Sequence, residues 1–390
     1  MEPNWDSIRE KYFPALKKFT YLMAAAASPL NTSAYDNAIK YFNEMLNFGD
    51  LHNETFFMEI QNARIIISEY LNAKPQEIAF MINTSSGMTT VAHLFENEKG
   101  EILYPSIEFP ASVHIFKRMG FPCKKVIDNN NKYLFEDFKK ELTENTKYLI
   151  HSHVQSFNGF RQNLDKLGNF CRENNLISII NATQSFGSFE IDVKKQNIDI
   201  LVSSALKWIG CGFGIGILYI KENLIEERSL PFTSWLSVVN PLSMDNENLS
   251  VIKKTLSMDS FGGCPNFPAL FCLKGSLDLI KDEIGDGSIQ VGVKKIQERV
   301  IFLTSEFIKD LKNLDFKIIT PLELEYRSGI ITVEHEKARR IYQHLTKNNI
   351  HVTLKKYPRL RKHTLIRFAI NYYNNLEDLN HAIKVLKEVL

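Results

Sequence analysis

Residues 177–220, ISIINATQSFGSFEIDVKKQNIDILVSSALKWIGCGFGIGILYI, decide the fold of this chain. They contain three apolar runs, Ile177–Ile180, Ile198–Val202 and Ile215–Ile220, that are bounded by polar or glycine-rich turns. Short apolar runs between such turns predict buried strands. Side chains at the carboxyl ends of strands in an α/β sheet face the crevice where ligands bind. The polar residues that follow the first two runs therefore predict a binding site.

Lys207 is the candidate nucleophile of this site. It lies between Leu206 and Trp208, and an apolar setting lowers the pKa of a lysine and makes its amine nucleophilic. The glycine run at 210–216 has a superficial likeness to a dinucleotide-binding loop. It leads into a strand, whereas that loop lies between a strand and a helix. We therefore expect no NAD here and interpret the glycines as letting the backbone pass close to Lys207.

The same rhythm of strands and helices extends toward the N-terminus. Repeated strand–helix units with short connections predict an α/β fold with a doubly wound, mostly parallel sheet. The expected strands are Ile78–Ile82, Glu101–Tyr104, Cys123–Ile127 and Tyr148–His151, and the expected helices are Gly87–Phe95, Ala111–Met119, Tyr133–Leu142 and Leu164–Glu173.

A second α/β pattern occupies the C-terminal part of the chain. We expect an N-terminal arm (1–50) that packs with the small domain, a large domain (51–264) and a smaller C-terminal domain (265–390). The expected elements of the small domain are helices at Pro268–Ile284, Val291–Leu314 and Glu336–Asn348, strands at Gly329–Val333, His351–Leu354 and Leu365–Ile370, and a last helix capped by Asn375.

Composition bounds the class of protein. With 390 residues, 44% hydrophobic and 24% charged, the chain is typical of a globular protein. Its net charge of +2 gives no reason to expect a nucleic acid or a membrane as partner. The apolar run Tyr21–Leu30 is too short to span a bilayer. The five cysteines form no CxxC pair and the N-terminus has no signal-peptide pattern, so we expect a cytoplasmic location.

The segment INTSSGMTT (82–90) follows an expected strand and opens a helix. The N–H groups of a helix N-terminus, with the hydroxyls of Thr84, Ser85 and Ser86, suit a phosphate. An ordinary serine-capped helix is the simpler interpretation of the segment taken alone.

Three further features could carry chemistry. His151 and His153 share a face of one strand, but two imidazoles without a third ligand are weak support for a metal, so we expect none and place His153 near a cofactor ring. The basic run Lys355–His363 is either a solvated face or a loop that attracts an anionic substrate. Arg367, on an apolar strand, binds either a substrate carboxylate or a structural partner.

Together these segments resemble the class V aminotransferase family of pyridoxal-phosphate enzymes of fold type I, which includes cysteine desulfurases, kynureninases and isopenicillin-N-epimerase-like proteins. The resemblance extends from YLMAAAASPL (21–30) to NYYNNLEDL (371–379). It implies pyridoxal 5'-phosphate as the cofactor, held as a Schiff base by Lys207, an amino acid as the substrate and a homodimer as the assembly. It also implies that Arg367 receives the substrate α-carboxylate.

The resemblance further implies which residues contact the cofactor. Ser85, Ser86 and Gly87 match the phosphate turn, and Ser204 matches a second phosphate ligand. Phe109 stands where an aromatic ring or a histidine stacks on the pyridine. The remaining contacts are Gln155 and Gln184 near the phenolic oxygen, Asn181 at the pyridine nitrogen, and Cys264 in the loop FGGCPN (261–266), which in this family crosses the dimer interface to the partner's cofactor phosphate.

Three departures from the family pattern matter. Asn181 stands where the family has an aspartate, and an amide cannot hold the ring nitrogen protonated by charge. Leu206 replaces a histidine, and Cys264 replaces a threonine. The loop before Arg367 contains no cysteine, which disfavours cysteine desulfurase activity because that reaction needs a mobile thiolate there.

The resulting hypothesis is a pyridoxal-phosphate enzyme, aminotransferase-like, that acts on an amino acid. A lyase or an epimerase of the same fold is the alternative, because Asn181 weakens the electron sink. A catalytically weak pseudoenzyme that serves as a binding module is the third hypothesis. The basic run at Lys355–His363 favours an acidic or phosphorylated amino acid as the substrate.

Overall fold

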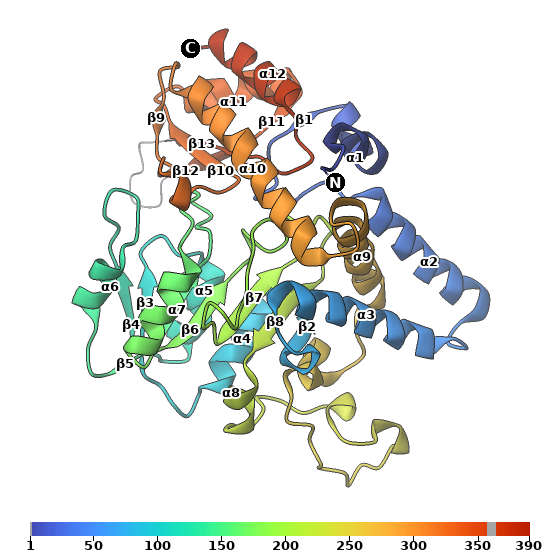
Figure 1. Ribbon diagram of the computed structural model, residues 1–390. Helices are drawn as coiled ribbons and strands as arrows, with labels where there is room; N and C mark the ends of the chain where they lie inside the picture. The colour runs from blue at the N-terminus through green and yellow to red at the C-terminus, as the bar shows by residue number, and fades with distance from the viewer. Residues whose placement is uncertain (1, 357–363) are drawn as a thin grey trace.

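A seven-stranded sheet forms the centre of the computed structural model, which describes residues 2–356 and 364–390 (Figure 1). Its strands lie in the order β2-β8-β7-β6-β5-β3-β4. They are β2 (Ile78–Met81), β3 (Glu101–Pro105), β4 (Cys123–Val126), β5 (Thr146–Ser152), β6 (Ile177–Asn181), β7 (Ile200–Ser204) and β8 (Gly216–Ile220). The expected strands are present, and β7 begins two residues later than predicted.

The sheet is mixed but mostly parallel, as predicted. β4, β3, β5, β6 and β7 run parallel to one another, whereas β8 runs antiparallel to both β7 and β2. A parallel crossover needs a connection of a dozen or more residues, usually a helix. The glycine-rich segment 205–215 contains no helix, so β8 returns directly beside β7 and the Lys207 turn lies at the end of this hairpin.

Helices cover both faces of the sheet, which gives two cores. Ile179 and Val202 pack on the side of α4 and α5, whereas their neighbours Ile180 and Leu201 pack on the side of α3 and α7. No helix in the described part of the chain is both long enough and apolar enough to cross a lipid bilayer. The helices are α3 (Asn53–Leu71), α4 (Thr84–Leu94), α5 (Pro110–Arg118), α6 (Phe135–Glu141), α7 (Leu164–Glu173) and α8 (Glu222–Glu226).

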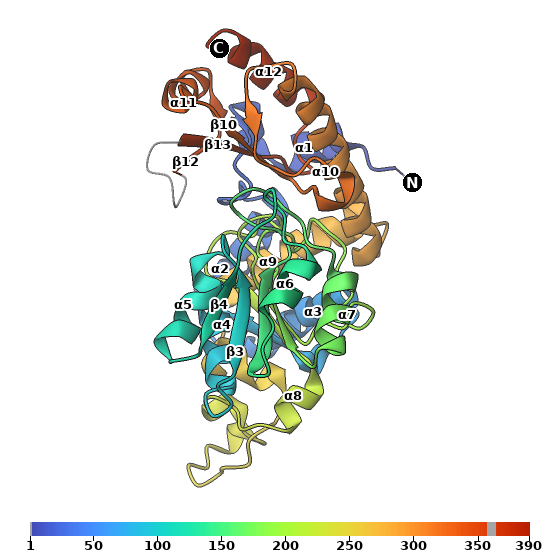
Figure 2. The same ribbon diagram turned by 90° about the vertical axis from the view of Figure 1, so that its left-hand side faces the viewer.

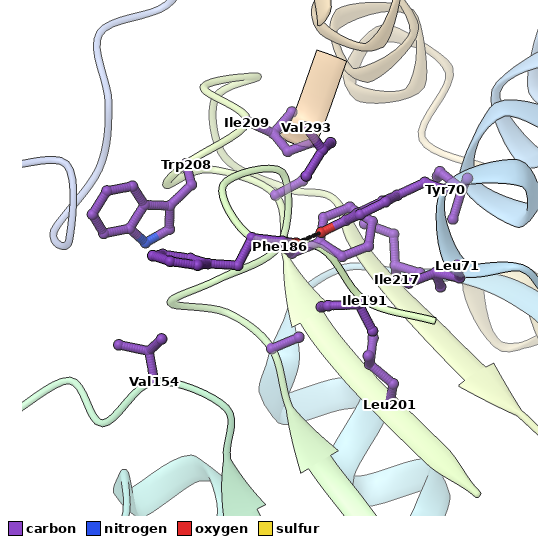
Figure 3. Close-up of a cluster of buried hydrophobic side chains, with 14 of the residues drawn as sticks. Tyr70, Leu71, Val154, Phe186, Ile191, Leu201, Trp208, Ile209, Ile217 and Val293 are labelled. Atoms are coloured by element: carbon purple, nitrogen blue, oxygen red, sulfur yellow. Dashed lines mark hydrogen bonds between the residues drawn. The ribbon is translucent and has the colours of Figure 1, made fainter. Parts of the chain in front are cut away.

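A buried cluster supports the segment that carries Lys207 (Figure 3). Trp208 and Ile209, which follow the lysine, pack with Phe186 and with Val293 of α10 (Ile289–Leu311). Tyr70 at the end of α3 donates a hydrogen bond from its hydroxyl to the carbonyl of Phe189, at 2.6 Å. The backbone around Lys207 is thus fixed by packing on its inner side.

A smaller antiparallel sheet lies above the large one in Figures 1 and 2. Its order is β12-β13-β10-β9, and helices pack against it to form a separate core. Thr332 and Thr353 are the direct cross-strand partners of Arg367, one on each neighbouring strand, so these three side chains share one face of the sheet. The elements are β9 (Lys317–Ile318), β10 (Ile330–Glu334), β12 (Thr353–Lys356), β13 (Thr364–Ala369), α11 (Ala338–Lys347) and α12 (Leu376–Lys387).

Two elements of the C-terminal part differ from the prediction. The strand expected at His351–Leu354 is divided between β11 (Ile350–His351) and β12, because the chain changes its pairing partner from β1 to β13 between them. The helix expected at Pro268–Ile284 is α9 (Phe267–Asp278), which continues as a wider π-helical turn over Leu279–Ile284.

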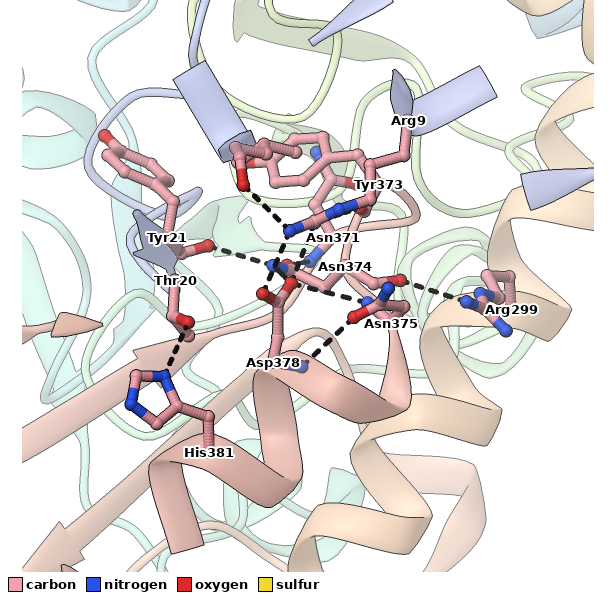
Figure 4. Close-up of polar contacts among 11 residues, drawn as sticks. Arg9, Thr20, Tyr21, Arg299, Asn371, Tyr373, Asn374, Asn375, Asp378 and His381 are labelled. Carbon is pink, nitrogen blue, oxygen red and sulfur yellow. Dashed lines mark hydrogen bonds and ion pairs between the residues drawn. The ribbon is translucent and has the colours of Figure 1, made fainter. Parts of the chain in front are cut away.

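The N-terminal arm is attached to the small sheet. β1 (Thr20–Tyr21) pairs in parallel with β11, and Arg9 of α1 (Trp5–Tyr12) forms a two-pronged ion pair with Asp378 of α12, at 2.8 and 3.0 Å (Figure 4). Beyond β1, the backbone N–H of Ser28 donates to the carbonyl of Leu206, at 3.1 Å, before α2 (Thr32–Phe48) begins. The arm therefore lies against the Lys207 turn, and the division into domains at residues 50 and 264 stays a prediction.

Candidate functional site

A cavity of about 190 Å³ lies at the carboxyl ends of β5, β6 and β7. This is where a parallel α/β sheet places its ligands. Seven residues predicted from the sequence line it, and Ser156 is among those the prediction missed. The lining residues are Asn83, Thr84, Ser85, Phe109, Ala111, Ser152, Ser156, Asn181, Thr183, Gln184, Ser204, Leu206 and Lys207.

Three larger hollows lie elsewhere on the described part of the chain. One, of about 710 Å³, borders α2 and α3, a second, of about 530 Å³, lies between α1 and α12, and a third, of about 330 Å³, lies among residues 233–248. The cavity at the sheet edge contains Lys207, the pKa of whose amine burial lowers to about 7. Perturbed ionisable groups gather at functional sites, so we place the site in the smaller cavity.

Lys207 is the reactive group of this cavity. Burial, and then the positive charge of Arg367, lower the pKa of its amine to about 7. The amine lies 5.6 Å from the centre of the Phe109 ring. Among the described residues, no ion pair includes Lys207. A large fraction of this amine is therefore neutral at physiological pH and able to act as a nucleophile or a base.

Hydroxyl groups and a helix N-terminus form one wall. The hydroxyl oxygens of Thr84 and Ser204 lie 2.7 Å apart, as do those of Thr84 and Thr183. Helix α4 begins at this point, and Ser85 is exposed in its first turn. The positive end of a helix dipole with several hydroxyls suits a phosphate group.

The serines of this turn have different roles. Asn83 is the N-cap, because its side-chain oxygen accepts from the N–H of Ser86, at 3.0 Å. The Ser86 hydroxyl donates a hydrogen bond to the backbone carbonyl of Asn83, at 2.8 Å. Ser86 therefore closes a capping box and does not line the cavity, whereas Ser85 does. Gly87 acts by its size, since a Cβ there would lie 2.6 Å from Cγ1 of Val202 on β7.

Asn181 is held by a chain of hydrogen bonds. Its side-chain oxygen accepts from the N–H of Thr183, at 3.0 Å, and its amide nitrogen donates to the Ser112 hydroxyl, at 2.9 Å. That hydroxyl in turn donates to the carboxylate of Glu108, at 2.9 Å. These contacts fix the orientation of the amide, whose oxygen keeps one lone pair and whose nitrogen keeps one N–H for a further hydrogen bond.

Glu108 is a buried residue that the sequence prediction missed. Its carboxylate also accepts from the N–H of Ser152, at 2.7 Å, from the side chain of Gln155, at 2.9 Å, and from the hydroxyl of Ser152. These donors satisfy the hydrogen-bonding capacity of the buried carboxylate. Its position directly before Phe109 in the motif IEFPAS was the available signal.

Gln155 is directed away from the cavity and Ser156 toward it. Gln155 is fully buried against Glu108, whereas the Ser156 hydroxyl accepts from Gln184, at 3.3 Å, and from Arg367, at 3.1 Å. The two residues lie at the start of a turn, in which the N–H of Gly159 donates to the carbonyl of Gln155 at 2.9 Å. The position expected for Gln155 is thus filled by the residue after it. Gln184 itself lines the cavity, and Trp208 donates to its oxygen, at 3.1 Å.

Arg367 reaches the same place from the small sheet. It is 3% exposed, donates from Nη1 to the Ser156 carbonyl, at 2.9 Å, and has a buried Nε without a partner among the described residues. Burial lowers its pKa to about 10. Within the described part of the chain, no carboxylate forms an ion pair with it. This favours a bound carboxylate over the structural pair that the sequence left open.

Three further predictions from the sequence concern residues that do not line the cavity. Cys264 is exposed in the loop before α9 and outside the cavity. His153 is buried with its ring 6.2 Å from that of Phe189, and burial and Arg161 hold its pKa well below the usual range. Of the basic run Lys355–His363, only Lys355 and Lys356 belong to the described residues.

Comparison with known proteins places these features in a family. A model of the class V aminotransferase family matches residues 20–381. A probable cysteine desulfurase of Pyrococcus abyssi is 24% identical over 349 residues, which cover 85% of this chain and 83% of that protein. An uncharacterised aminotransferase of Bacillus subtilis, YcbU, is 21% identical over 373 residues, covering 95% of this chain and 94% of that protein.

Solved structures agree in fold. The apo structure of a cysteine desulfurase from Thermococcus onnurineus has a TM-score of 0.87 at 19% identity, covering 100% of this chain and 98% of that one. The cystine C–S lyase C-DES, in complex with its reaction product cysteine persulfide, has a TM-score of 0.86 at 19% identity, covering 97% and 99%. A variant of C-DES carries glycine covalently linked to its pyridoxal-phosphate cofactor.

The family match extends through nearly the whole chain. It confirms the resemblance inferred from the motifs around Lys207 and Arg367, and with it the expected cofactor and the α/β architecture of fold type I. The protein therefore belongs to the class V aminotransferase family of pyridoxal-phosphate-dependent enzymes.

Proposed function

We propose that this protein is an aminotransferase-like enzyme that binds pyridoxal 5'-phosphate through Lys207 and acts at the α-carbon of an amino acid. One observation carries the proposal: a buried lysine amine with a pKa of about 7 lies in a cavity at the sheet edge, and beside it lies the guanidinium of Arg367, which forms no ion pair within the described residues. The amine suits covalent capture of an aldehyde, and the guanidinium suits a carboxylate.

The residues of the cavity fit the cofactor. The wall formed by Ser85, Thr84 and Ser204 at the start of α4 would hold the phosphate. The Phe109 ring would stack on the pyridine. The Asn181 oxygen would face the ring nitrogen, and the remaining polar groups of this wall, Gln184 and Ser156, would face the phenolic oxygen. Gln155 and Ser86 would support these contacts from behind.

Bound pyridoxal phosphate supplies an aldehyde that captures amines and a ring that stabilises negative charge on the substrate's α-carbon. The protein's own part is to position the substrate and move its proton. Arg367 would hold the α-carboxylate through its fork of N–H groups, which fixes the α-carbon above Lys207. The neutral Lys207 amine would then take the α-proton and return it, because its lowered pKa suits a base at physiological pH.

Asn181 favours a second candidate of the same class, a lyase or an epimerase. An amide oxygen accepts a hydrogen bond but carries no charge, so it holds a protonated ring nitrogen less firmly than a carboxylate does. Elimination and epimerisation make a smaller demand on the electron sink than transamination. The amine of Lys207 and the guanidinium of Arg367 are both present at the site, which argues against a protein that only binds and does not catalyse.

Cysteine desulfurase activity is disfavoured, although several relatives carry that name. The reaction requires a thiolate that can reach the substrate. All five cysteines of this chain lie at or before Cys272, and none lies on the segment that leads to Arg367. Burial raises the pKa of Cys211 and Cys272, which makes these thiols less reactive.

We also propose a homodimer, and α2 offers the surface for it. Tyr35, Ile39, Phe42 and Leu46 are exposed at helical spacing along its outer side, and Leu46 is 81% exposed. A continuous apolar stripe of this kind marks an interaction surface. The exposed loop with Cys264 precedes α9, which packs against α2, so it would lie near a partner bound there. A cytoplasmic location remains part of the proposal.

The decisive experiment measures cofactor attachment. The purified protein, mixed with pyridoxal phosphate, should acquire a visible absorption band, and borohydride reduction followed by mass spectrometry should find the cofactor on the peptide that contains Lys207. Lys207→Ala should lose both signals, and Lys356→Ala, which removes an exposed lysine outside the cavity, should keep them. A wild-type protein that acquires no band would refute the proposal.

A further inference from the structure

We propose that the substrate is an amino acid with a second anionic group on its side chain, and that Lys355 is the residue that binds this group. The inference rests on the proposed function and adds to it the class of the substrate. It starts from the wall of the cavity where the small sheet meets Ser156.

Two cations meet at one backbone oxygen on this wall. Lys355 donates from Nζ to the carbonyl of Ser156, at 3.1 Å, and Arg367 donates to the same oxygen from Nη1, at 2.9 Å. The two charged groups are therefore at most about 6 Å apart. Lys355 lies on β12 and Arg367 on the adjacent β13, and the register places them on the same face of the small sheet.

Nothing in the described part of the chain neutralises these charges. No ion pair among residues 2–356 and 364–390 includes Lys355, Arg367 or Lys207. The sequence of residues 357–363, YPRLRKH, contains no acidic residue. Burial, together with Arg367 and Lys207, lowers the pKa of Lys355 to about 7. Arg367 and Lys355 thus share one small region, and a bound anion would stabilise the charged form of both.

Unused hydrogen-bond donors face the same region. The buried Nε of Arg367 and the buried hydroxyl of Thr353 have no partner within the described residues. Thr353 is the direct cross-strand neighbour of Arg367, so both atoms lie on the face that carries Lys355. Buried donors without partners are costly and are normally satisfied by protein, water or ligand. An anion at this face would accept from both.

A single carboxylate does not account for this arrangement. Arg367 can bind an α-carboxylate in its fork by itself, and the cofactor phosphate would occupy the wall at α4. Lys355 then remains as a half-buried cation that would lie beside the substrate's side chain. A second carboxylate, sulfonate or phosphate on that side chain would pair with it. The shared chemistry is a side-chain anion, and the size of the group is left for the experiment.

The first test compares unreactive anions on the cofactor-loaded enzyme. Maleate and succinate carry two carboxylates, and crotonate and butyrate are four-carbon acids with one. Calorimetric titration should give at least tenfold tighter binding of the dianions. Lys355→Met should abolish this preference and leave the affinity for monoanions within about twofold. Lys355→Arg should retain it, and Lys356→Met, on the exposed neighbour of the same strand, should change nothing.

The second test identifies the anionic group. The kcat/KM values for aspartate, glutamate, cysteate and O-phosphoserine should exceed those for the neutral analogues asparagine, glutamine and serine. The best of the four distinguishes a carboxylate from a sulfonate or phosphate. Lys355→Met should lower the value for the anionic substrate at least tenfold through KM, with little change for its neutral analogue.

Clear outcomes would overturn the inference. Equal affinity of the wild-type enzyme for dianions and monoanions would do so without any variant, and so would a Lys355→Met variant that retains the dianion preference. A variant that loses both classes of ligand equally would show that Lys355 only supports Ser156. Cofactor loading is measured separately by absorbance. Failure to load refutes the proposed function, whereas a loaded, active enzyme without dianion preference refutes only this inference.

Discussion

The carboxylate of Glu108 reaches the amide of Asn181 through a single hydroxyl, that of Ser112. Each of the two hydrogen bonds is 2.9 Å long. The family aspartate is absent at position 181, but the carboxyl group of Glu108 lies one side chain behind the amide. Because the hydroxyl has one proton, which it donates to Glu108, it can only accept from Asn181. Ser112 and Thr183 together therefore fix the orientation of the amide.

Ser112→Ala should loosen this arrangement. Without the hydroxyl, the amide of Asn181 loses its buried acceptor and Glu108 loses a donor, so the free energy of unfolding should fall by about 1–3 kcal/mol. The amide would also be free to turn, and the affinity for pyridoxal phosphate should fall several-fold. Denaturant unfolding and fluorescence titration with the cofactor measure the two effects.

Ser237→Ala is the matched control, because it also removes a buried hydroxyl, which donates to Ser257 at 2.9 Å, outside the cavity. It should reduce stability and leave cofactor affinity unchanged. Equal effects of the two substitutions on cofactor affinity would show that Ser112 has no specific role.

Asn181→Asp should have opposite effects with and without the cofactor. A carboxylate at position 181 would face the hydroxyl of Ser112, whose only proton is already donated to Glu108, and would add a second negative charge to a buried region. The cofactor-free protein should therefore melt at a lower temperature. A protonated ring nitrogen would relieve the repulsion, so saturating pyridoxal phosphate should raise Tm more than in the wild type.

The same variant addresses the reaction class. A stronger electron sink should increase transamination of generic amino acids, measured as keto-acid formation. If transamination does not increase although the cofactor binds, the amide is suited to elimination or epimerisation, and the argument from a weakened sink is wrong for this enzyme.

The apolar and helical periodicities of the sequence predicted the elements of the large sheet and its parallel strands well. Lys207 could be identified from its apolar neighbours and its place after a strand. Glu108 and Ser156 were missed, although Glu108 directly precedes Phe109, because their partners come from distant parts of the chain: Glu108 is bonded to Ser152, and Ser156 to Arg367. The choice between Gln155 and Ser156 depends on how the turn that begins there is oriented against the cavity, and that is set by tertiary structure.

The lowered pKa of Lys207, about 7, should make the cofactor-free protein more stable as the pH rises from 7. The pKa of this amine is lower in the folded than in the unfolded chain, so between the two values the unfolded chain binds more protons and unfolding costs more at higher pH. The contribution is at most about 1.4 kcal/mol per pH unit. Lys355, whose pKa is also lowered to about 7, adds a slope of the same sign.

Urea unfolding between pH 7 and 8.5 measures this slope. Above that range the buried thiols of Cys171 and Cys211, whose pKa values are raised by burial, act in the opposite direction. Lys207→Met should remove part of the slope, and Lys356→Met should not. An unchanged slope in Lys207→Met would mean that the amine is charged in the folded protein at pH 7 and above.

A negative charge on the exposed apolar stripe of α2, which contains Phe42 and Leu46, should prevent dimer formation. Phe42→Asp and Leu46→Asp place a carboxylate on side chains that are exposed in the single chain, so the monomer should remain folded while the association is lost. Sedimentation should show half the wild-type mass with an unchanged circular dichroism spectrum. Leu324→Asp, which changes an exposed leucine away from α2, should remain dimeric. A wild-type protein that sediments as a monomer at micromolar concentration would contradict the proposal.

Gly87→Ala should weaken cofactor binding by moving α4. The added methyl group would lie 2.6 Å from Cγ1 of Val202, a β-branched side chain on β7 that cannot turn away easily. Helix α4 must then shift from the sheet, which should cost about 1–3 kcal/mol of stability. Its first turn, with Thr84 and Ser85, would move with it, and affinity for pyridoxal phosphate should fall.

Val202→Ala makes room for the methyl group, so the double variant Gly87→Ala/Val202→Ala should regain affinity that Gly87→Ala alone has lost. A double variant as weak as the single one would show that Gly87 is required for its backbone and not for the space beside Val202.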